Sequence, residues 1–286
     1  MRRVLITGKN SYIGSSLENW VATEPDEFKV DTVDMRDGFW QSMDFSVYDS
    51  VFHVAGIAHV STNPNMKDSY YKVNRDLAIE TAKKAKAEGV KQFIFMSSII
   101  VYGDSSSNDN VINRKTIPKP SNFYGSSKLQ AEEGLMLLNC DIFKIVILRP
   151  PMIYGRGSRG NYPKLSMLSQ KLPIFPDFDN ARSMLHIDNL CEFIKLLIEN
   201  DESGLFFPQN SEYVKTTEMV KLIAEVHNKK IWFTRIFNPI IRLLIKHIKV
   251  IDKMFGNFIY DLSISDYKKG NYQIRNFSES IQLTEK

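Results

Sequence analysis

The first half of the chain alternates short apolar runs with longer segments in which apolar residues recur at helical spacing. The short runs predict strands at 4–7, 28–33, 50–54, 91–96 and 143–148. The longer segments predict helices at 13–21, 71–85 and 122–138, whereas the stretch after 34 leaves little room for one. Because parallel strands need long crossover connections, this order predicts an α/β fold with a doubly wound parallel sheet that is covered on both faces.

The pattern loosens after Arg149-Pro150-Pro151, where several glycines lie close together. Helical spacing returns at 188–198 and at 216–226. We therefore expect a first domain formed by 1–155 plus about 183–200. The remaining residues, 156–182 and 201–286, are expected to form a smaller region.

The segment 239–255 follows Asn238 and begins with Pro239, a combination that favours the start of a helix. It predicts a single amphipathic helix with an apolar stripe of Ile241, Leu244, Ile248, Ile251 and Phe255 and a basic face of Arg242, Lys246, Lys249 and Lys253. Such a helix suits either a solvated face of the smaller region or an anionic membrane surface. The pattern alone favours the solvated face.

The composition narrows the classes of function. A formal net charge of +4 over 286 residues, without a block of like charge, gives no electrostatic support for nucleic-acid binding. Cys140 and Cys191 lie far apart, so neither a disulfide framework nor a metal site is expected. The apolar run at 4–6 is too short for a signal peptide, and no uninterrupted apolar stretch reaches the ~18 residues of a membrane span. We expect a cytoplasmic protein.

A glycine-rich turn lies between the first strand and the first helix. Gly8, Ser11 and Gly14 are three residues apart, which is the context of a dinucleotide fingerprint with serine in place of the middle glycine. Glycine lets the backbone approach a diphosphate, and the helix N-terminus supplies N–H donors. Asp34 follows at the offset where an acid binds the adenosine ribose, which favours NAD, while Arg36 leaves NADP open. Further predicted cofactor contacts are Tyr12, Ile13, Asp44, Phe45, Ala55 and Gly56.

A tyrosine and a lysine, Tyr124 and Lys128, lie four residues apart on the helix predicted at 122–138, downstream of Ser97-Ser98. Positions i and i+4 share one helix face, so the lysine is expected to lie beside the phenol. A neighbouring cation lowers the pKa of a tyrosine, which would make Tyr124 a general acid or base. Together with the glycine turn, this arrangement predicts an enzyme that transfers hydride.

These motifs, in this order, resemble the extended short-chain dehydrogenase/reductase family, in particular its NAD-dependent epimerase/dehydratase group, which acts on nucleotide sugars. The matching residues are Thr7-Gly8-x-x-Ser11-x-x-Gly14, Asp34, His53-Val54-Ala55-Gly56, Asn74, Ser97-Ser98 with Val101-Tyr102-Gly103, Tyr124-x-x-x-Lys128, Arg149-Pro150 with Tyr154-Gly155, and Arg182 with His186-Ile187-Asp188.

The resemblance implies a Rossmann-type sheet and a role for each matching residue. Tyr124 would be the acid/base, Lys128 would orient the nicotinamide ribose and acidify Tyr124, and Ser98 would hydrogen-bond the reacting sugar oxygen. Asn74 and Ser97 would lie on the cofactor side of the site. The smaller region would bind substrate, with Arg182 at the nucleotide diphosphate and Arg156 and Arg159 as further candidates.

The residues after Ser98 narrow the reaction. Related dehydratases and decarboxylases carry carboxylates there, whereas this chain has Ile99 and Ile100, which cannot exchange protons. Reduction of a 4-keto sugar and C4 epimerisation with retained NAD both remain open. A short C-terminal region and Pro150-Pro151-Met152, where epimerases tend to carry an asparagine, favour the reductase. Similarity to proteins of surface-polysaccharide clusters suggests a UDP-linked 4-keto-N-acetylhexosamine as substrate.

Two further expectations concern the class of protein and its oligomeric state. A non-catalytic dinucleotide sensor would suit the same fold, but it would not need Ser98, Tyr124 and Lys128 together. Family members often dimerise through helices like the one that carries Tyr124, so a homodimer is a further expectation.

Overall fold

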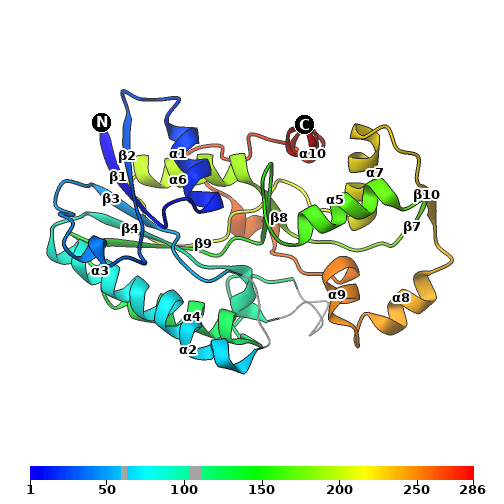
Figure 1. Ribbon diagram of the computed structural model, residues 1–286, viewed down its shortest axis with the longest axis horizontal. Coiled ribbons are helices and arrows are strands. Elements are labelled where there is room, and N and C mark those ends of the chain that lie inside the picture. Colours follow the sequence, from blue (N-terminus) through cyan, green and yellow to red (C-terminus); the bar gives the residue numbers. More distant parts are fainter. Residues whose placement is uncertain (59–62, 104–110) are drawn as a thin grey trace.

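A six-stranded parallel sheet forms the centre of the computed structural model, which describes residues 1–58, 63–103 and 111–286 (Figure 1). The strand order is β2-β1-β3-β4-β5-β9, and every neighbouring pair is parallel. The predicted doubly wound α/β fold is therefore confirmed. The strands are β1 (Arg2–Thr7), β2 (Phe28–Val33), β3 (Ser50–His53), β4 (Gln92–Met96), β5 (Lys144–Leu148) and β9 (Gly204–Phe206).

Helices cover both faces of this sheet. Helices α1 (Tyr12–Val21) and α6 (Ile187–Glu199) pack on one face, and α3 (Leu77–Ala87) and α4 (Phe123–Met136) pack on the other. Successive strand side chains point to opposite faces, so each strand contributes to both cores. On β3, for example, Phe52 joins the α1 and α6 side, while Val51 joins the α3 and α4 side.

Three parts of the first half differ from a plain strand and helix alternation. The stretch after β2 holds only a short 3-10 turn (Phe39–Gln41), as the limited room there predicted. A short helix α2 (Lys67–Tyr70) follows a 3-10 turn at Pro64–Met66. The helix predicted at 71–85 begins as a π-helix (Tyr71–Asp76) and becomes α-helical only in α3.

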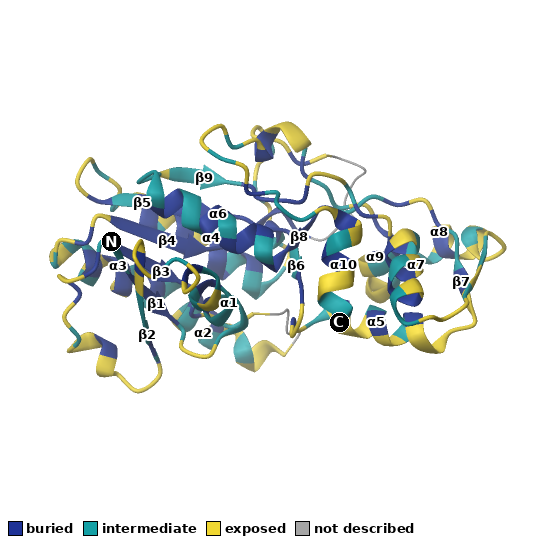
Figure 2. Ribbon diagram, turned by 90° about the horizontal axis from the view of Figure 1, so that it is seen from above, coloured by how far each residue is buried: buried dark blue, intermediate teal, exposed yellow. Residues whose placement is uncertain are grey.

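The strand β9 lies within 201–286, which the sequence assigned to the smaller region, yet it pairs with β5 as the outer strand of the sheet. Its three residues are too few for a pattern that marks a strand. The other elements from β6 onward lie mainly beyond the carboxyl ends of the strands (Figure 2). They are β6 (Met152–Tyr154), α5 (Asn161–Lys171), β7 (Ile174–Pro176), β8 (Met184–His186), α7 (Thr216–Val226), β10 (Trp232–Thr234), α8 (Asn238–Leu244), α9 (Lys249–Phe255), a 3-10 turn (Leu262–Ser265) and α10 (Phe277–Glu285).

The single amphipathic helix predicted at 239–255 is wrong, because the chain forms α8 and α9 separated by a break at 245–248. Ile241 and Phe255 of the predicted stripe are buried in one cluster with Phe175 and Val220, whereas Ile248 is exposed. Across the described ranges, no helix combines the length and apolar character needed to cross a membrane.

Candidate active site

The candidate residues meet at the carboxyl ends of β1, β3 and β4. The chain passes from β1 to β2 on one side, and β3 then pairs on the other side of β1. Ligands of open α/β sheets bind in the crevice at such a reversal of strand order. Gly8 follows β1, Gly56 follows β3 and Ser98 follows β4. The topology therefore brings the glycine turn and the predicted chemical groups to one edge of the sheet.

The glycine turn allows a close backbone approach. Gly8 has a φ of +96°, and a Cβ at this position would lie 3.0 Å from the backbone nitrogen of Ala55. The Ser11 hydroxyl caps α1 by accepting a hydrogen bond from the Gly14 N–H at 3.2 Å. A Cβ on Gly14 would lie 2.6 Å from Ser11 Oγ, so only glycine fits under this cap. Together with the positive end of the α1 dipole, the turn fits the diphosphate of a dinucleotide.

Two buried hydroxyls near this turn, Tyr12 OH and Ser158 Oγ, have no hydrogen-bond partner within the described part of the chain. Both lie near Gly155: a Cβ there would be 2.8 Å from Tyr12 OH, and the Gly155 carbonyl accepts a hydrogen bond from Ser158 N at 3.0 Å. A buried hydroxyl without a partner costs ~1–3 kcal/mol. Oxygen atoms of a bound ligand would remove that cost, which is a second feature that fits a dinucleotide at the start of α1.

The acid predicted to bind ribose, Asp34, directly follows β2 and is bound by Arg36. The guanidinium contacts both carboxylate oxygens, with Nη2 2.5 Å from Oδ2. These hydrogen bonds lower the pKa of Asp34 to about 2, so the carboxylate is ionised at neutral pH. Arg36 is 83% exposed and, in this arrangement, neutralises Asp34.

The predictions for the adenine side have mixed outcomes. Phe45 is fully buried in the core, where Lys84 lies over its ring at 4.9 Å, so the ring is unavailable to an adenine. The sequence could not separate this core residue from a binding residue, because both are apolar. Asp44 is exposed and accepts hydrogen bonds from the backbone and hydroxyl of Ser46. Ala55 is buried beside Gly8, at the floor of the turn.

The predicted catalytic hydroxyls lie together. Asn122 caps α4 by accepting a hydrogen bond from the Gly125 N–H at 2.9 Å, which places Tyr124 in the first turn of that helix. Tyr124 is hydrogen-bonded to Ser98, and its ring lies 6.3 Å from that of Tyr70. Ser98 Oγ also accepts a 3.3 Å hydrogen bond from Ile100 N, which orients the serine at the end of β4.

Lys128 is buried one turn below Tyr124. Its Nζ donates a 2.7 Å hydrogen bond to the Met96 carbonyl and lies 4.5 Å from the centroid of the Phe95 ring. Burial lowers the pKa of Lys128 to about 7, opposed by the negative charge of Glu132. The lysine is therefore able to gain and lose a proton near neutral pH.

The expected lowering of the tyrosine pKa is not found. Burial raises the pKa of Tyr124 to about 12, and the hydrogen bond with Ser98 offsets only part of this effect. The sequence argument assumed a fully charged ammonium beside the phenol. In the structure, the lysine is itself desolvated and directed at Met96, so its charge does not offset the burial of the phenol.

Asn74 acts as a clamp beside these residues and is fully buried in the π-helix. Its carboxamide accepts a hydrogen bond from Ile57 N at 2.8 Å, donates to Ile57 O at 3.2 Å and donates to Ser127 Oγ at 3.1 Å. A Cβ on Gly56 would lie 2.9 Å from Asn74 Oδ1 and 3.3 Å from Lys128 Nζ. Asn74 therefore ties the segment after β3 to α4 and holds the glycine against the lysine.

A buried ion pair beneath the site was missed by the sequence analysis. Glu132 and Arg149 pair at 2.5 Å, with side chains that are 4% and 8% exposed. Ser97 also donates to Glu132, and Arg149 Nη1 donates to Tyr102 OH at 2.6 Å. The Ser97 hydroxyl is therefore part of this buried network. The sequence did contain one indication of this role for Glu132, because Glu132 follows Lys128 by one helical turn on the same face of α4.

The three arginines predicted to meet substrate are not equivalent. Arg182 Nη1 donates to the backbone carbonyls of Gly256 at 2.8 Å and Asp252 at 3.4 Å, and burial lowers the pKa of Arg182 to about 10. Its Nη1 therefore anchors the end of α9. Arg156 and Arg159 are exposed in the loop after β6, and Ser158 lies between them in sequence.

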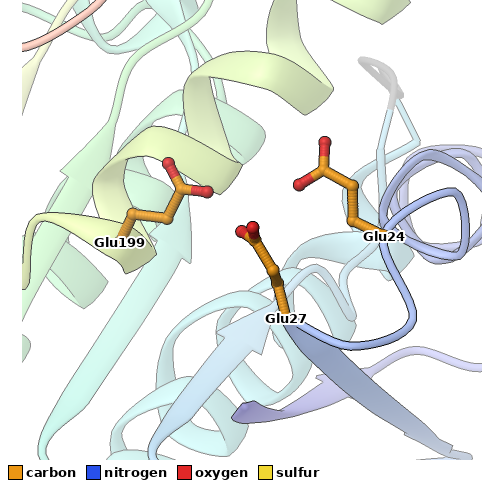
Figure 3. Close-up of side chains that lie close together, drawn as sticks. All are labelled: Glu24, Glu27 and Glu199. Carbon is orange, nitrogen blue, oxygen red and sulfur yellow. The ribbon is translucent and has the colours of Figure 1, made fainter.

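An acidic cluster lies away from this site. Figure 3 shows the carboxylates of Glu24, Glu27 and Glu199 facing one another, from the α1–β2 connection and the end of α6. The ammonium of Lys195 lies 2.7 Å from Glu24 Oε1 and 3.6 Å from Glu199 Oε1, where it offsets part of the negative charge. Lys195 therefore already contacts two of the three carboxylates.

His53, at the end of β3, is fully buried, and its Nδ1 lies 2.9 Å from Thr7 Oγ1 while its Nε2 has no partner among the described residues. Burial, aided by the charge of Lys128, lowers the pKa of His53 to about 3. Its neutral form is thus part of the packing between β1, β3 and β4.

Acid is expected to destabilise the protein through His53. An unfolded histidine binds a proton below about pH 6.5, whereas His53 in the fold stays neutral down to about pH 3. Stability is therefore lost as the pH falls through this window, because the unfolded state binds a proton that the folded state excludes. His53→Leu should flatten the fall in urea midpoint between about pH 6.5 and 4, and His247→Leu, at an exposed position, should leave it unchanged. An equal pH slope in His53→Leu and native protein would contradict this expectation.

Comparison with known proteins agrees with this geometry. The chain is 28% identical to a UDP-glucose 4-epimerase of Vibrio cholerae over 92% of this chain and 88% of the relative. It is also 28% identical to the N-acetyl-alpha-D-glucosaminyl-diphospho-ditrans,octacis-undecaprenol 4-epimerase of Escherichia coli O157:H7, covering 80% and 73%. The solved structure of RMD from Pseudomonas aeruginosa, complexed with NADPH, superposes with a TM-score of 0.77 at 17% identity, covering 99% and 98%.

The match to a family model is decisive for membership. Residues 4–206 match the model of the NAD dependent epimerase/dehydratase family, a span that runs from β1 to β9 and includes the glycine turn, Ser98, Tyr124 and Lys128. The chain belongs to the NAD dependent epimerase/dehydratase family, whose enzymes use a nicotinamide dinucleotide.

Proposed function

We propose that the protein is an NAD(P)-dependent oxidoreductase that acts at C4 of a nucleotide sugar, and specifically a reductase of a UDP-linked 4-keto-N-acetylhexosamine. The observation that carries this proposal is the hydrogen bond between Tyr124 and Ser98 above the buried Lys128, at the sheet edge that also holds the glycine turn. The isoleucines after Ser98 leave no carboxylate there for a dehydration, and Ile99 is buried.

The residues suit the reducing direction. A bound reduced dinucleotide supplies the hydride that adds to C4. As the keto oxygen gains the electron pair of the broken C=O π bond, Ser98 donates a hydrogen bond to it and Tyr124 transfers its phenolic proton to it, giving a C4 hydroxyl. The pKa of Tyr124, about 12, keeps the phenol protonated at neutral pH, which is the state that reduction requires. The pKa of Lys128, about 7, allows the lysine to pass a proton toward the phenolate.

The residues that would hold the cofactor are those of the glycine turn and of the clamp behind it. Gly8, Ser11 and Gly14 would hold the diphosphate, and Lys128 would face the nicotinamide ribose. Asp34 would bind the adenosine ribose hydroxyls, which favours NAD over NADP because a carboxylate repels an added phosphate. The smaller region, 156–182 and most of 207–286, would bind the sugar nucleotide.

C4 epimerisation with retained NAD is the second candidate, because two relatives with 28% identity carry the name of a 4-epimerase. Pro150 and Pro151 favour the reductase. Neither proline carries a side-chain amide that could contact a sugar hydroxyl. The Pro150 carbonyl accepts a 2.9 Å hydrogen bond from Ile99 N, and Pro151 is buried.

A substrate panel separates these reactions. Purified protein would be incubated with UDP-glucose, UDP-N-acetylglucosamine and a UDP-4-keto-6-deoxy-N-acetylhexosamine, each with NADH and with NADPH. Stoichiometric oxidation of the reduced cofactor with the keto sugar alone supports the reductase. Interconversion of C4 epimers without net cofactor loss supports the epimerase instead. Inactivity on all three sugars would overturn the nucleotide-sugar assignment.

Cofactor preference is expected to depend on Asp34. Replacing it with serine removes the acceptor for the ribose hydroxyls and frees Arg36 for a phosphate. Because hydrogen bonds to charged groups contribute ~1.5–3 kcal/mol, Asp34→Ser should shift the ratio of kcat/KM for NADH over NADPH by about tenfold or more toward NADPH. Asp37→Ser, at an exposed position nearby, is the matched control and should leave the ratio unchanged. A ratio unaffected by Asp34→Ser would place the ribose elsewhere.

A further inference from the structure

The outer end of the lobe formed by β7, β10, α8 and α9 exposes an unusual number of large apolar side chains. We call this surface the α8 face and define it by residues with the exposed fractions Trp232 76%, Ile236 74%, Phe237 41%, Ile240 58%, Leu243 68% and Val250 67%. Single exposed apolar residues are ordinary on protein surfaces, but a group of this size marks a site of interaction.

These residues are not the core stripe of the segment. The inward side of α8 and α9 is already packed, because Ile241 and Phe255 are buried with Phe175 and Phe178. The α8 face is a second apolar surface on the opposite side of the same elements. The segment after Asn238 therefore has two apolar surfaces, whereas the sequence predicted one apolar stripe.

The strand pair beside α8 extends this surface. Trp232 of β10 lies opposite Ile174 of β7 in the parallel register, and both side chains are exposed, at 76% and 46%. The next pair, Phe233 and Phe175, packs inward. Ile240 and Leu243 are three residues apart on α8 and so share one side of that helix. Figure 1 places β7, β10 and α8 together at the end of the molecule farthest from the sheet, and Figure 2 places β7 and α8 there as well.

The charged residues within the segment that carries most of the α8 face have a single sign. Residues 226–251 contain no Asp or Glu, but they contain six basic residues, all of them exposed: Lys229, Lys230, Arg235, Arg242, Lys246 and Lys249. The whole chain has a formal net charge of only +4, so the remainder of the protein is net negative. Asp177, which lies outside this segment, pairs with Arg235 at 2.7 Å. The other five basic residues also have no acidic residue within the segment.

The exposed apolar and basic residues together indicate which kind of partner the α8 face binds. Interfaces between proteins are depleted in lysine, whereas membrane-surface segments combine lysine and arginine with tryptophan, phenylalanine and leucine. Anionic headgroups attract basic side chains, and tryptophan is favoured at the boundary between headgroups and acyl chains. We propose that the α8 face docks the protein onto an anionic lipid bilayer, with Trp232, Ile240 and Leu243 entering the headgroup region.

Flotation with vesicles tests this proposal on the full-length protein. Vesicles of phosphatidylcholine mixed with phosphatidylglycerol should carry the protein upward, whereas vesicles of phosphatidylcholine alone should carry much less. Added salt should weaken the association, because it screens charge at the membrane surface. Absence of the native protein from the anionic vesicle fraction at low salt would overturn the proposal.

Two variants assign the binding to the α8 face. The triple variant Trp232→Ser/Ile240→Ser/Leu243→Ser removes the apolar contribution, and Arg242→Glu/Lys246→Glu/Lys249→Glu reverses the charge. Since each basic residue near a surface contributes about fivefold to membrane partitioning, the charge-reversed variant should bind at least about a hundredfold more weakly. The apolar variant should lose at least about tenfold.

Matched controls use exposed residues outside the α8 face. Ile117→Ser/Leu137→Ser/Ile142→Ser removes three apolar side chains that are 84%, 86% and 81% exposed. Lys29→Glu/Lys83→Glu/Lys268→Glu reverses three exposed lysines and matches the net charge of the first reversal. Both controls should bind vesicles like the native protein. If they lose as much binding as the α8 variants, the α8 face is not the docking surface and the proposal fails.

Self-association is the competing outcome. Sedimentation velocity of the native protein and the apolar variant, without lipid, shows whether the α8 face joins two copies. A dimer that the apolar variant converts to a monomer, together with no vesicle binding, would assign the surface to a second copy and overturn the membrane proposal. Unchanged oligomeric state with lost vesicle binding supports it.

Discussion

Tyr124→Phe is expected to reduce kcat by about 10²–10⁴-fold, which is the usual contribution of a positioned proton donor. The change removes one oxygen atom and leaves the ring in its place beside Tyr70. In the proposed reaction this oxygen delivers the proton to the C4 oxygen, so loss of the proton donor should lower kcat while the affinity for the reduced dinucleotide stays close to native. Steady-state kinetics with the keto sugar, together with a titration of NADH binding, measures both quantities.

Two comparisons make this prediction specific. Tyr71→Phe, in the π-helix, removes a hydroxyl from a tyrosine that contacts Arg75 and should leave kcat unchanged. Ser98→Ala removes the hydrogen-bond partner of Tyr124 and should also lower kcat, but by less than Tyr124→Phe, because the proton donor remains. A Tyr124→Phe protein with native kcat would mean that Tyr124 is not the acid, whatever its position.

Glu132→Gln is expected to lower the free energy of unfolding by about 3–5 kcal/mol, which is the usual cost of breaking a buried ion pair by removing one charge. Arg149 is 8% exposed, and its guanidinium makes three hydrogen bonds to the carboxylate that this variant would neutralise. Urea denaturation measures the loss. The matched control is Glu225→Gln in the exposed pair with Lys221, for which surface ion pairs predict a change below about 1 kcal/mol.

Removing both charges tests the cause. The double variant Glu132→Leu/Arg149→Met leaves no unpaired charge in the core, so it should be more stable than Glu132→Gln, although Ser97 and Tyr102 lose their partners. If the double variant is less stable than the single variant, packing or hydrogen bonding at this position outweighs the unpaired charge. Lys128 offers a second readout, because Glu132 opposes the lowering of its pKa and Glu132→Gln should therefore lower that pKa further.

The sheet and its main helices were predictable because each has a strong pattern. β4 carries the apolar run Phe93–Met96 before Ser97, and α4 carries its cap at Asn122 and its functional pair at helical spacing. β9 was not predictable, because three residues carry no periodicity and their pairing with β5 depends on the rest of the fold. The break between α8 and α9 was missed for a related reason: the inward stripe is continuous in sequence, but the chain turns at 245–248.

The candidate site followed from motifs, but its energetics did not. The glycine turn, Asp34, Tyr124 and Lys128 could be named from their spacing, and Ser98 from the family resemblance. The burial that raises the pKa of Tyr124 and lowers that of Lys128 comes from residues distant in sequence, so the expected acidification of Tyr124 was wrong. Glu132 was overlooked because its partner Arg149 lies on β5, beyond the reach of a helical pattern.

Apolar character alone does not show whether a residue is buried or exposed. Phe45 was predicted at the adenine and lies in the core, whereas Trp232 and Leu243 were not singled out and are exposed. A sequence shows that a residue is apolar, but the side on which it lies depends on tertiary packing. Arg182 illustrates the same point for charge, because its guanidinium binds backbone carbonyls of Asp252 and Gly256.

The most direct test of the central claim is the fate of a hydride label. The native protein would be incubated with a UDP-4-keto-6-deoxy-N-acetylhexosamine and NADH that carries deuterium at the transferable position, and the product would be examined by NMR. The proposed chemistry predicts one deuterium at C4 of the sugar and a hydroxyl on the same carbon, with no product from Tyr124→Phe at comparable times. Deuterium at another carbon, or product without deuterium, would contradict the assignment of this protein as a C4 reductase.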